Sequence, residues 1–153
     1  MFDSKLIIEP AVDAREIEVA VTGNESPQAY IPGEIIPSHQ FYDYDAKYLD
    51  PDGARLQIPA EIEEEQQLAI RMLAIRAYFV AEARGLSRVD FFMEKSSGRF
   101  ILNEINTMPG FTNISMFPLM CEASGLPYGD LIDELIELGM REWSKRNHLR
   151  FCK

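Results

Sequence analysis

The feature that most constrains the fold of this chain is a predicted β-hairpin near its middle. Residues 87–94 and 99–106 are two short apolar-rich runs, and the polar sequence Ser96-Ser97-Gly98 separates them. This pattern predicts an antiparallel hairpin with a three-residue loop in which Gly98 adopts the left-handed backbone conformation. The hairpin therefore fixes which polar side chains of this region share a face.

A predicted metal site lies on one face of this hairpin. The loop length pairs Asp90 with Glu104 and Arg88 with Asn106, and side chains two residues apart share a strand face. Two carboxylates and an amide suit a hard divalent cation, and Mg²⁺ fits best. Arg88 beside them can hold a phosphate in a bidentate fork. The alternative is the solvated polar face of an ordinary hairpin.

The sequence that follows the hairpin favours the metal site over that alternative. Residues 106–112 read Asn-Thr-Met-Pro-Gly-Phe-Thr, so a Pro-Gly turn comes directly after the candidate ligands. Backbone N–H groups in such a turn can donate hydrogen bonds to an oxyanion. The region then combines a metal site with a site for developing negative charge.

The net charge of the chain limits the classes of partner that it is expected to bind. It has 153 residues and a net charge of −10, and the segment 141–153 has five basic residues against a single glutamate. An acidic body argues against nonspecific nucleic-acid binding. A polyanion such as ATP would need bound cations, which again favours a metal. The two cysteines and two histidines have no metal-ligand spacing, and we assign them no role.

Targeting signals are not visible in the sequence. The first ten residues have no cationic region followed by an apolar run, so we expect no secretory signal. No apolar run is long enough to span a bilayer, and a cytoplasmic location is expected.

The order of predicted elements indicates an α+β fold. Residues 5–9, 16–22 and 29–36 are predicted strands of an antiparallel meander. A helix is predicted from Pro59 to the Arg84-Gly85 pair, with Leu68, Met72, Ile75 and Phe79 as an apolar stripe facing a sheet. Two further helices are predicted at 115–124 and 128–139. We expect a single antiparallel sheet covered by helices.

A long irregular segment at about 38–58 interrupts this pattern. It interleaves tyrosines and acidic residues, and Lys47 is a lone cation among them. Long structureless segments in compact domains are often lids or binding loops. We expect a mobile loop here. The alternative is a surface loop whose aromatic side chains pack on the core.

Three stretches give the chain a family resemblance. They are Phe41-Tyr42-Asp43-Tyr44-Asp45-Ala46-Lys47-Tyr48, Arg88-Val89-Asp90 and Asn103-Glu104-Ile105-Asn106-Thr107-Met108-Pro109-Gly110-Phe111-Thr112. With them the chain resembles the C-terminal portion of a D-alanine–D-alanine ligase, an ATP-grasp enzyme. The resemblance implies an ATP-grasp C-terminal domain over residues 1–142, with the lid loop at about 38–58 and the metal-binding hairpin at 87–106. Residues 143–153 would be a basic tail.

The resemblance also implies roles for single residues. Asp90, Glu104 and Asn106 would hold two Mg²⁺ (or Mn²⁺) ions on the ATP phosphates, and Arg88 and the backbone N–H of Gly110 would stabilise an oxyanion. The other implied positions are Lys47 and Tyr48 on the lid, with Lys47 near the transferred phosphate and the substrate carboxylate; Ser115 and Met116 at the second D-alanine; and Glu9, Val12 and Glu16 at adenosine. Pro10-Ala11-Val12 departs from the Lys-aromatic-aliphatic run common in the family.

The implied reaction joins two D-alanines for peptidoglycan precursor synthesis through an acyl phosphate, under a lid that excludes water. The intact tyrosine-rich loop and Met116 after Ser115 favour D-alanine over D-lactate as the second substrate, and D-serine remains an alternative. The family is commonly homodimeric, and its N-terminal portion has no counterpart here. We therefore expect little activity from this chain alone, and a noncatalytic nucleotide-binding fragment or another ATP-grasp ligase stays open.

Overall fold

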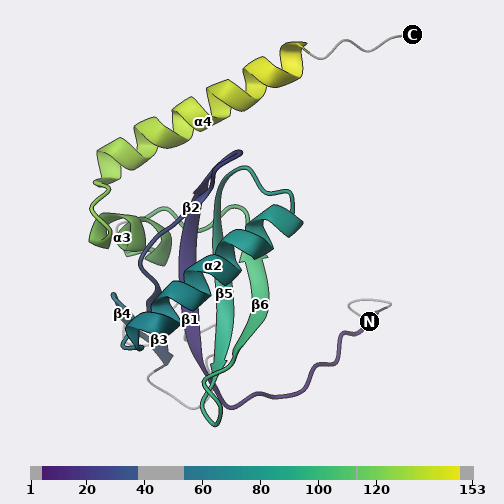
Figure 1. Cartoon of the computed structure of the whole chain (residues 1–153), viewed down its shortest axis with the longest axis vertical. Helices are drawn as coiled ribbons and strands as arrows, with labels where there is room; N and C mark the ends of the chain where they lie inside the picture. The colour runs from purple at the N-terminus through teal and green to yellow at the C-terminus, as the bar shows by residue number, and fades with distance from the viewer. Residues whose placement is uncertain (1–4, 38–53, 113, 149–153) are drawn as a thin grey trace.

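The fold is a six-stranded antiparallel sheet with helices on both faces, seen in a computed structural model of the chain (Figure 1). The structure describes residues 5–37, 54–112 and 114–148. The strands are β1 (Ala14–Gly23), β2 (Gln28–Ala29), β3 (Gly33–Pro37), β4 (Ala54–Gln57), β5 (Gly85–Glu94) and β6 (Phe100–Asn106). The helices are α2 (Glu64–Val80), α3 (Met116–Ala123) and α4 (Tyr128–His148). The expected α+β class is confirmed.

Strand β1 is the centre of the sheet, whose order is β4-β3-β1-β5-β6 with β2 also paired to β1. Its ten residues pair with β5 along their whole length, from Ala14 opposite Glu94 to Gly23 opposite Gly85. On its other side it pairs with β3. Because both edges of β1 are hydrogen-bonded, alternate side chains of this strand are committed to opposite faces of the sheet.

Helix α2 covers one face of the sheet (Figure 1). It buries Ile70, Ala74 and Tyr78 against the odd-numbered residues of β1 and β5, among them Val19 and Phe91. Aliphatic side chains on two facing surfaces exclude water from this layer. This face is the apolar core of the molecule.

The predicted boundaries and buried stripe of α2 are wrong. The helix begins at Glu64, where Glu63 and Gln66 form a capping box, and it ends at Val80. Leu68, Met72 and Phe79 are exposed. Apolar residues lie nearly all round this helix, so polar contacts set its rotation: the Arg71 guanidinium donates twice to the Ala29 carbonyl, at 3.0 and 2.7 Å.

Helices α3 and α4 cover part of the opposite face. Met116, Phe117, Met120 and Cys121 of α3 pack with Leu131 of α4 against even-numbered residues of β1 and against β3. Burial raises the pKa of the Cys121 thiol to about 12, so this cysteine is uncharged in the folded state. The remainder of this face carries polar side chains.

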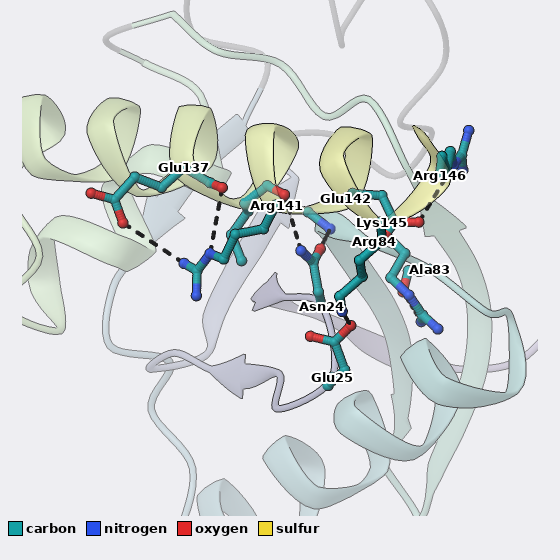
Figure 2. A network of polar contacts seen from close by, with 11 residues as sticks. Asn24, Glu25, Ala83, Arg84, Glu137, Arg141, Glu142, Lys145 and Arg146 are labelled. Carbon is teal, nitrogen blue, oxygen red and sulfur yellow. Dashed lines mark hydrogen bonds and ion pairs between the residues drawn. The ribbon is translucent and has the colours of Figure 1, made fainter. Parts of the chain in front are cut away.

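Hydrogen bonds of Asn24, in the turn after β1, connect α4 to the sheet (Figure 2). Asn24 Nδ2 donates to the carbonyl of Leu138 (3.0 Å), and Asn24 Oδ1 accepts from the N–H of Gly85 (3.1 Å). Lys145 forms an ion pair with Glu25 farther along the helix. These contacts hold α4 to the body while it runs on to His148. No described helix is both long and apolar enough to cross a membrane.

Two short segments differ from expectation. Residues 5–13 form no strand, and Leu6, Ile7 and Ile8 are each about nine-tenths exposed, so the predicted strand at 5–9 is wrong. An apolar run needs a neighbouring strand to pair with, and none of the described strands pairs with residues 5–13. Residues 54–57, expected within the loop, are β4 and pair with β3. Residues 38–53 of the predicted loop lie outside the described part.

Candidate functional site

The predicted pairing of four polar residues on β5 and β6 is confirmed. Asp90 lies opposite Glu104, and Arg88 lies opposite Asn106. The Asn106 amide joins the two carboxylates, because its Nδ2 lies 2.9 Å from Asp90 Oδ2 and 3.1 Å from Glu104 Oε1. The structure therefore brings the predicted metal ligands together on one face of the sheet.

The predicted three-residue loop of the hairpin is wrong, although the pairing at the site is right. Glu94 N–H donates to the Arg99 carbonyl (2.9 Å), which leaves four residues in the loop. Gly98 has a φ of +69°, as expected. Phe91 pairs with Leu102 while Asp90 pairs with Glu104, so Asn103 is an extra residue in β6. This β-bulge compensates for the longer loop.

The bulge also assigns β6 side chains to their faces. Phe100 joins the α2-side core and meets Phe91 edge-on, with ring centroids 6.4 Å apart. Glu104 and Asn106, which have the same number parity as Phe100, lie on the opposite face with Asp90. Regular alternation would put all three on one side. With Asn103 present in β6, the bulge is therefore what brings Glu104 and Asn106 to the face of the site.

The Arg88 guanidinium is shared between two acidic residues. Its Nε and Nη2 donate to Asp90 Oδ1 and Oδ2, both at 2.8 Å, and its Nε also lies 3.2 Å from Glu18 Oε2. Burial lowers the pKa of Arg88, but the hydrogen bonds to Asp90 and the charges of Glu18, Asp90 and Glu104 together raise it above its ordinary value. Arg88 is a fixed positive charge at this site.

Three carboxylates form a row across three adjacent strands. Glu18 on β1 lies opposite Asp90 on β5, which lies opposite Glu104 on β6. The side chains of Glu18 and Asp90 are almost fully buried, and Glu104 is exposed. Sequence analysis missed Glu18. Its alternation with Ile17 and Val19 was visible, but its neighbour on β5 depends on a long-range pairing.

The oxygen donors of this row fit a hard divalent cation in kind and in charge. Three carboxylates and the Arg88 guanidinium leave two uncompensated negative charges, the amount that one Mg²⁺ neutralises. Arg88 occupies both Asp90 oxygens in the present arrangement. Among the described residues, no three His, Cys, Asp or Glu side chains are grouped closely enough to hold a metal ion. The guanidinium therefore takes the place of a cation at Asp90.

A pocket of about 400 Å³ lies between the segment before β1 and the tip of the hairpin. Pro10, Ala11 and Val12 line it from one side and Ile101 from the other. Val12, a predicted adenosine contact, lines this pocket. Glu9 is exposed and does not line it. Glu16 lies on β1 two residues from Glu18, opposite Phe92.

Gly110 and the start of α3 lie close together, and residues 109–111 carry no assigned secondary structure. A side chain at Gly110 would meet Ser115 Oγ at 2.8 Å, so only glycine fits there without a shift. Ser115 Oγ accepts from the Thr112 N–H at 3.0 Å. Met116 is buried in the core beneath α3 and packs close to Gly33, so its side chain does not face solvent. Lys47 and Tyr48 lie outside the described residues.

Comparison with known proteins identifies relatives of the chain. Residues 1–137 match the family described as D-ala D-ala ligase C-terminus. The D-alanine–D-alanine ligase of Treponema denticola is 55% identical over 153 residues, which is all of this chain and 42% of that protein. That of Thermoanaerobacter sp. is 51% identical over 149 residues, 93% of this chain and 42% of that protein.

Solved structures agree with these matches. The D-alanine-D-alanine ligase from Coxiella burnetii matches with a TM-score of 0.78 and 41% identity. The match covers 91% of this chain and 35% of the ligase chain. The VanG D-Ala:D-Ser ligase from Enterococcus faecalis has a TM-score of 0.73 and 34% identity, over 84% of this chain and 37% of its own. The chain thus spans less than half the length of these relatives.

Proposed function

The chain belongs to the D-alanine–D-alanine ligase family, whose C-terminal part it matches, and we propose that it forms the metal, ATP and second-substrate portion of such a ligase. The proposed reaction joins two D-alanines at the expense of ATP through an acyl phosphate, for peptidoglycan precursors. The observation that carries it is the convergence of Asp90, Glu104 and Asn106 on one face beside Arg88. We propose that the reaction takes place in the cytoplasm, because its substrates are ATP and D-alanine.

Asp90, Glu104 and Asn106 would hold two Mg²⁺ or Mn²⁺ ions. Bound there, the ions would neutralise the phosphate charges during phosphoryl transfer. The chain's own share is to supply oxygen ligands. The hydrogen bonds from Asn106 Nδ2 to Asp90 and Glu104 support this assignment, because they keep the three side chains within reach of one another. The excess negative charge of the row supports it as well.

Arg88 and the Gly110 N–H are assigned to the oxyanion of the tetrahedral intermediate. Preorganised donors stabilise such charge most where they are fixed before reaction. Arg88 is held by two buried carboxylates, and a side chain at Gly110 would meet Ser115 Oγ at 2.8 Å. Ser115, adjacent to Gly110, is assigned to the carboxylate of the second D-alanine, and the buried Met116 adds no charge there.

The pocket beside Val12 is assigned to the adenine of ATP, with Glu16 and Glu9 toward the ribose. Its apolar lining residues, Pro10 to Val12 and Ile101, suit a flat heterocycle. The rest of the lining is polar, namely Asp13, Glu94, Ser96 and Arg99. A purine contacted mainly through the backbone tolerates the departure from the family's usual run. Lys47 and Tyr48 are assigned to the lid that keeps water from the acyl phosphate.

Activity requires a further portion of the ligase, which we propose to be an N-terminal half such as relatives carry. The exposed run Leu6 to Ile8 supports this. An apolar segment is stabilised when strands of another sheet pair with it on each side and its side chains are buried. A homodimer, as is common in the family, would form through that half. We expect the chain alone to bind nucleotide and turn over little.

A D-alanine–D-serine ligase is the second candidate. The structural likeness to VanG, described as a D-Ala:D-Ser ligase, favours it at 34% identity. The higher identity to D-alanine–D-alanine ligases favours the first candidate.

The test is ADP release by the purified chain with ATP, Mg²⁺ and D-alanine, alone and mixed with the remaining part of the Treponema denticola ligase. We expect background release alone and D-alanine-dependent release from the mixture. A panel of D-alanine, D-serine and D-lactate as the second substrate separates the two candidates. Nucleotide binding without release from any mixture would support a noncatalytic fragment, and strong turnover by the chain alone would refute the need for a second portion.

A further inference from the structure

We propose that Glu18 is a positioning residue that takes the Arg88 guanidinium when a divalent cation occupies Asp90, an inference that rests on the metal site proposed above. Arg88 would then alternate between two neighbouring carboxylates. One arrangement closes Asp90 to metal, and the other frees it.

The geometry gives Arg88 two acceptors within reach. Its Nε lies 2.8 Å from Asp90 Oδ1 and 3.2 Å from Glu18 Oε2, so a small rotation of the guanidinium exchanges one for the other. Glu18 and Asp90 are directly opposite on paired strands, which fixes the spacing of their backbones. The exchange requires no movement of the sheet.

The bidentate fork on Asp90 opposes metal binding. Both Asp90 oxygens accept from Arg88, so a cation at Asp90 must displace at least one of these hydrogen bonds. Only 15% of the Arg88 side chain is exposed, so water cannot fully replace the lost partner. A buried charge that loses its partner is costly. Glu18 supplies a replacement acceptor and so lowers the cost of releasing Asp90.

The charges also balance in the metal-bound arrangement. With Arg88 on Glu18 that pair is neutral, and Asp90 and Glu104 together carry the two negative charges that a divalent cation compensates. Glu18 has no direct part in coordination here. Its effect passes through Arg88, and this separates it from a general increase in negative charge.

Glutamate at this position is not required by packing alone. The side chain is fully buried on β1, and Ala20, the next residue on the same face of this strand, is a buried apolar residue. Buried ion pairs are often replaceable by apolar residues with no loss of stability. A functional constraint on Arg88 explains the retained charge.

The test measures Mn²⁺ binding to the full chain by the electron paramagnetic resonance signal of free Mn²⁺. E18Q is expected to weaken binding about tenfold, the size of one charge-assisted hydrogen bond. In an R88Q background the same substitution is expected to change binding less than about twofold, since no guanidinium then needs a second acceptor. E34Q is the matched control, because Glu34 is also a buried glutamate paired with an arginine, Arg15, but on the opposite face.

An equal loss in both backgrounds would show a general charge effect and overturn the proposal, as would an E18Q variant that binds like the unchanged chain. If the unchanged chain binds no Mn²⁺, the proposed metal site fails together with this inference. Where E18Q does not fold, the Arg88 Nε–H resonance of the unchanged chain decides. It is expected to shift when Mg²⁺ is added, and an unshifted resonance overturns the proposal.

Discussion

The two side-chain rows of β1 lie one residue apart and in opposite environments. Ile17, Val19 and Val21 enter the dry layer under α2, whereas Glu16 and Glu18 lie on the face that carries the candidate site. The same backbone hydrogen bonds position both rows. The contrast teaches that, in the middle of β1, adjacent residues separate a core position from a position at the candidate site.

The α2 face is expected to show the largest effect on stability. Phe91→Ala removes a ring buried against Phe100 and should lower the free energy of unfolding by about 3–5 kcal/mol, because a cavity replaces packed atoms. Urea denaturation measures this. A loss below about 1 kcal/mol would show that the two faces are not as distinct as the packing indicates.

The neighbouring residue, Asp90, tests the other face. Asp90→Asn should weaken Mn²⁺ binding by more than about tenfold while lowering the free energy of unfolding by about 1–2 kcal/mol, since it weakens one charged fork but Glu18 still holds Arg88. Mn²⁺ titration and urea denaturation of the same sample give both values. Unchanged Mn²⁺ affinity would contradict the metal assignment.

A buried tyrosine of helix α2, Tyr78, makes the stability of the α2 face depend on pH in the alkaline range. Burial raises the pKa of Tyr78 to about 12, while Arg84 lowers it slightly, and its hydroxyl donates to the Gly23 carbonyl at 2.7 Å. Because the folded-state pKa lies above the unfolded value near 10, this contribution is complete below pH 10 and is lost as the pH rises through 12.

Tyr78→Phe should therefore cost about 1–2 kcal/mol at neutral pH, since the Gly23 carbonyl loses its donor. It should also flatten the fall in stability above pH 10. Urea denaturation between pH 8 and about 11 checks both. Parallel curves for the two proteins would assign the alkaline fall to other groups, such as Tyr30.

The smallest effect on stability is expected on the exposed side of α4, away from both faces of the sheet. Glu137 and Arg141 form an exposed pair on α4, 3.8 Å apart, that solvent screens. Glu137→Gln should change the free energy of unfolding by less than about 0.5 kcal/mol and leave Mn²⁺ binding unchanged. Thermal unfolding measures this change. A value above about 0.5 kcal/mol would show that the exposed pair on α4 stabilises the fold more than its exposure indicates.

Local sequence patterns predicted the features that depend on neighbouring residues. The hairpin and the positive φ of Gly98 followed from turn chemistry. The pairing of Asp90 with Glu104 was predicted from a loop one residue too short, and it is correct because the bulge at Asn103 offsets that error. The strand at 16–22 and the helix in 115–124 also agree with β1 and α3.

Features set by contacts distant in sequence were not predictable. Glu18 joins the site only because β1 pairs with β5, some seventy residues along the chain. The rotation of α2 follows from the bonds of Arg71 to β2. The run 5–9 had the composition of a strand, but no strand in the described part of the chain pairs with it.

The bulge at Asn103 has a consequence for how the hairpin tolerates changes in length. It divides β6 into two parts whose side-chain phases are independent: the part near the tip sets Phe100 against Phe91, and the part near the base sets Glu104 against Asp90. Deleting Asn103 would convert the strand to regular alternation and leave both pairs where they are. A hairpin shorter by this one residue could therefore present the same ligand set.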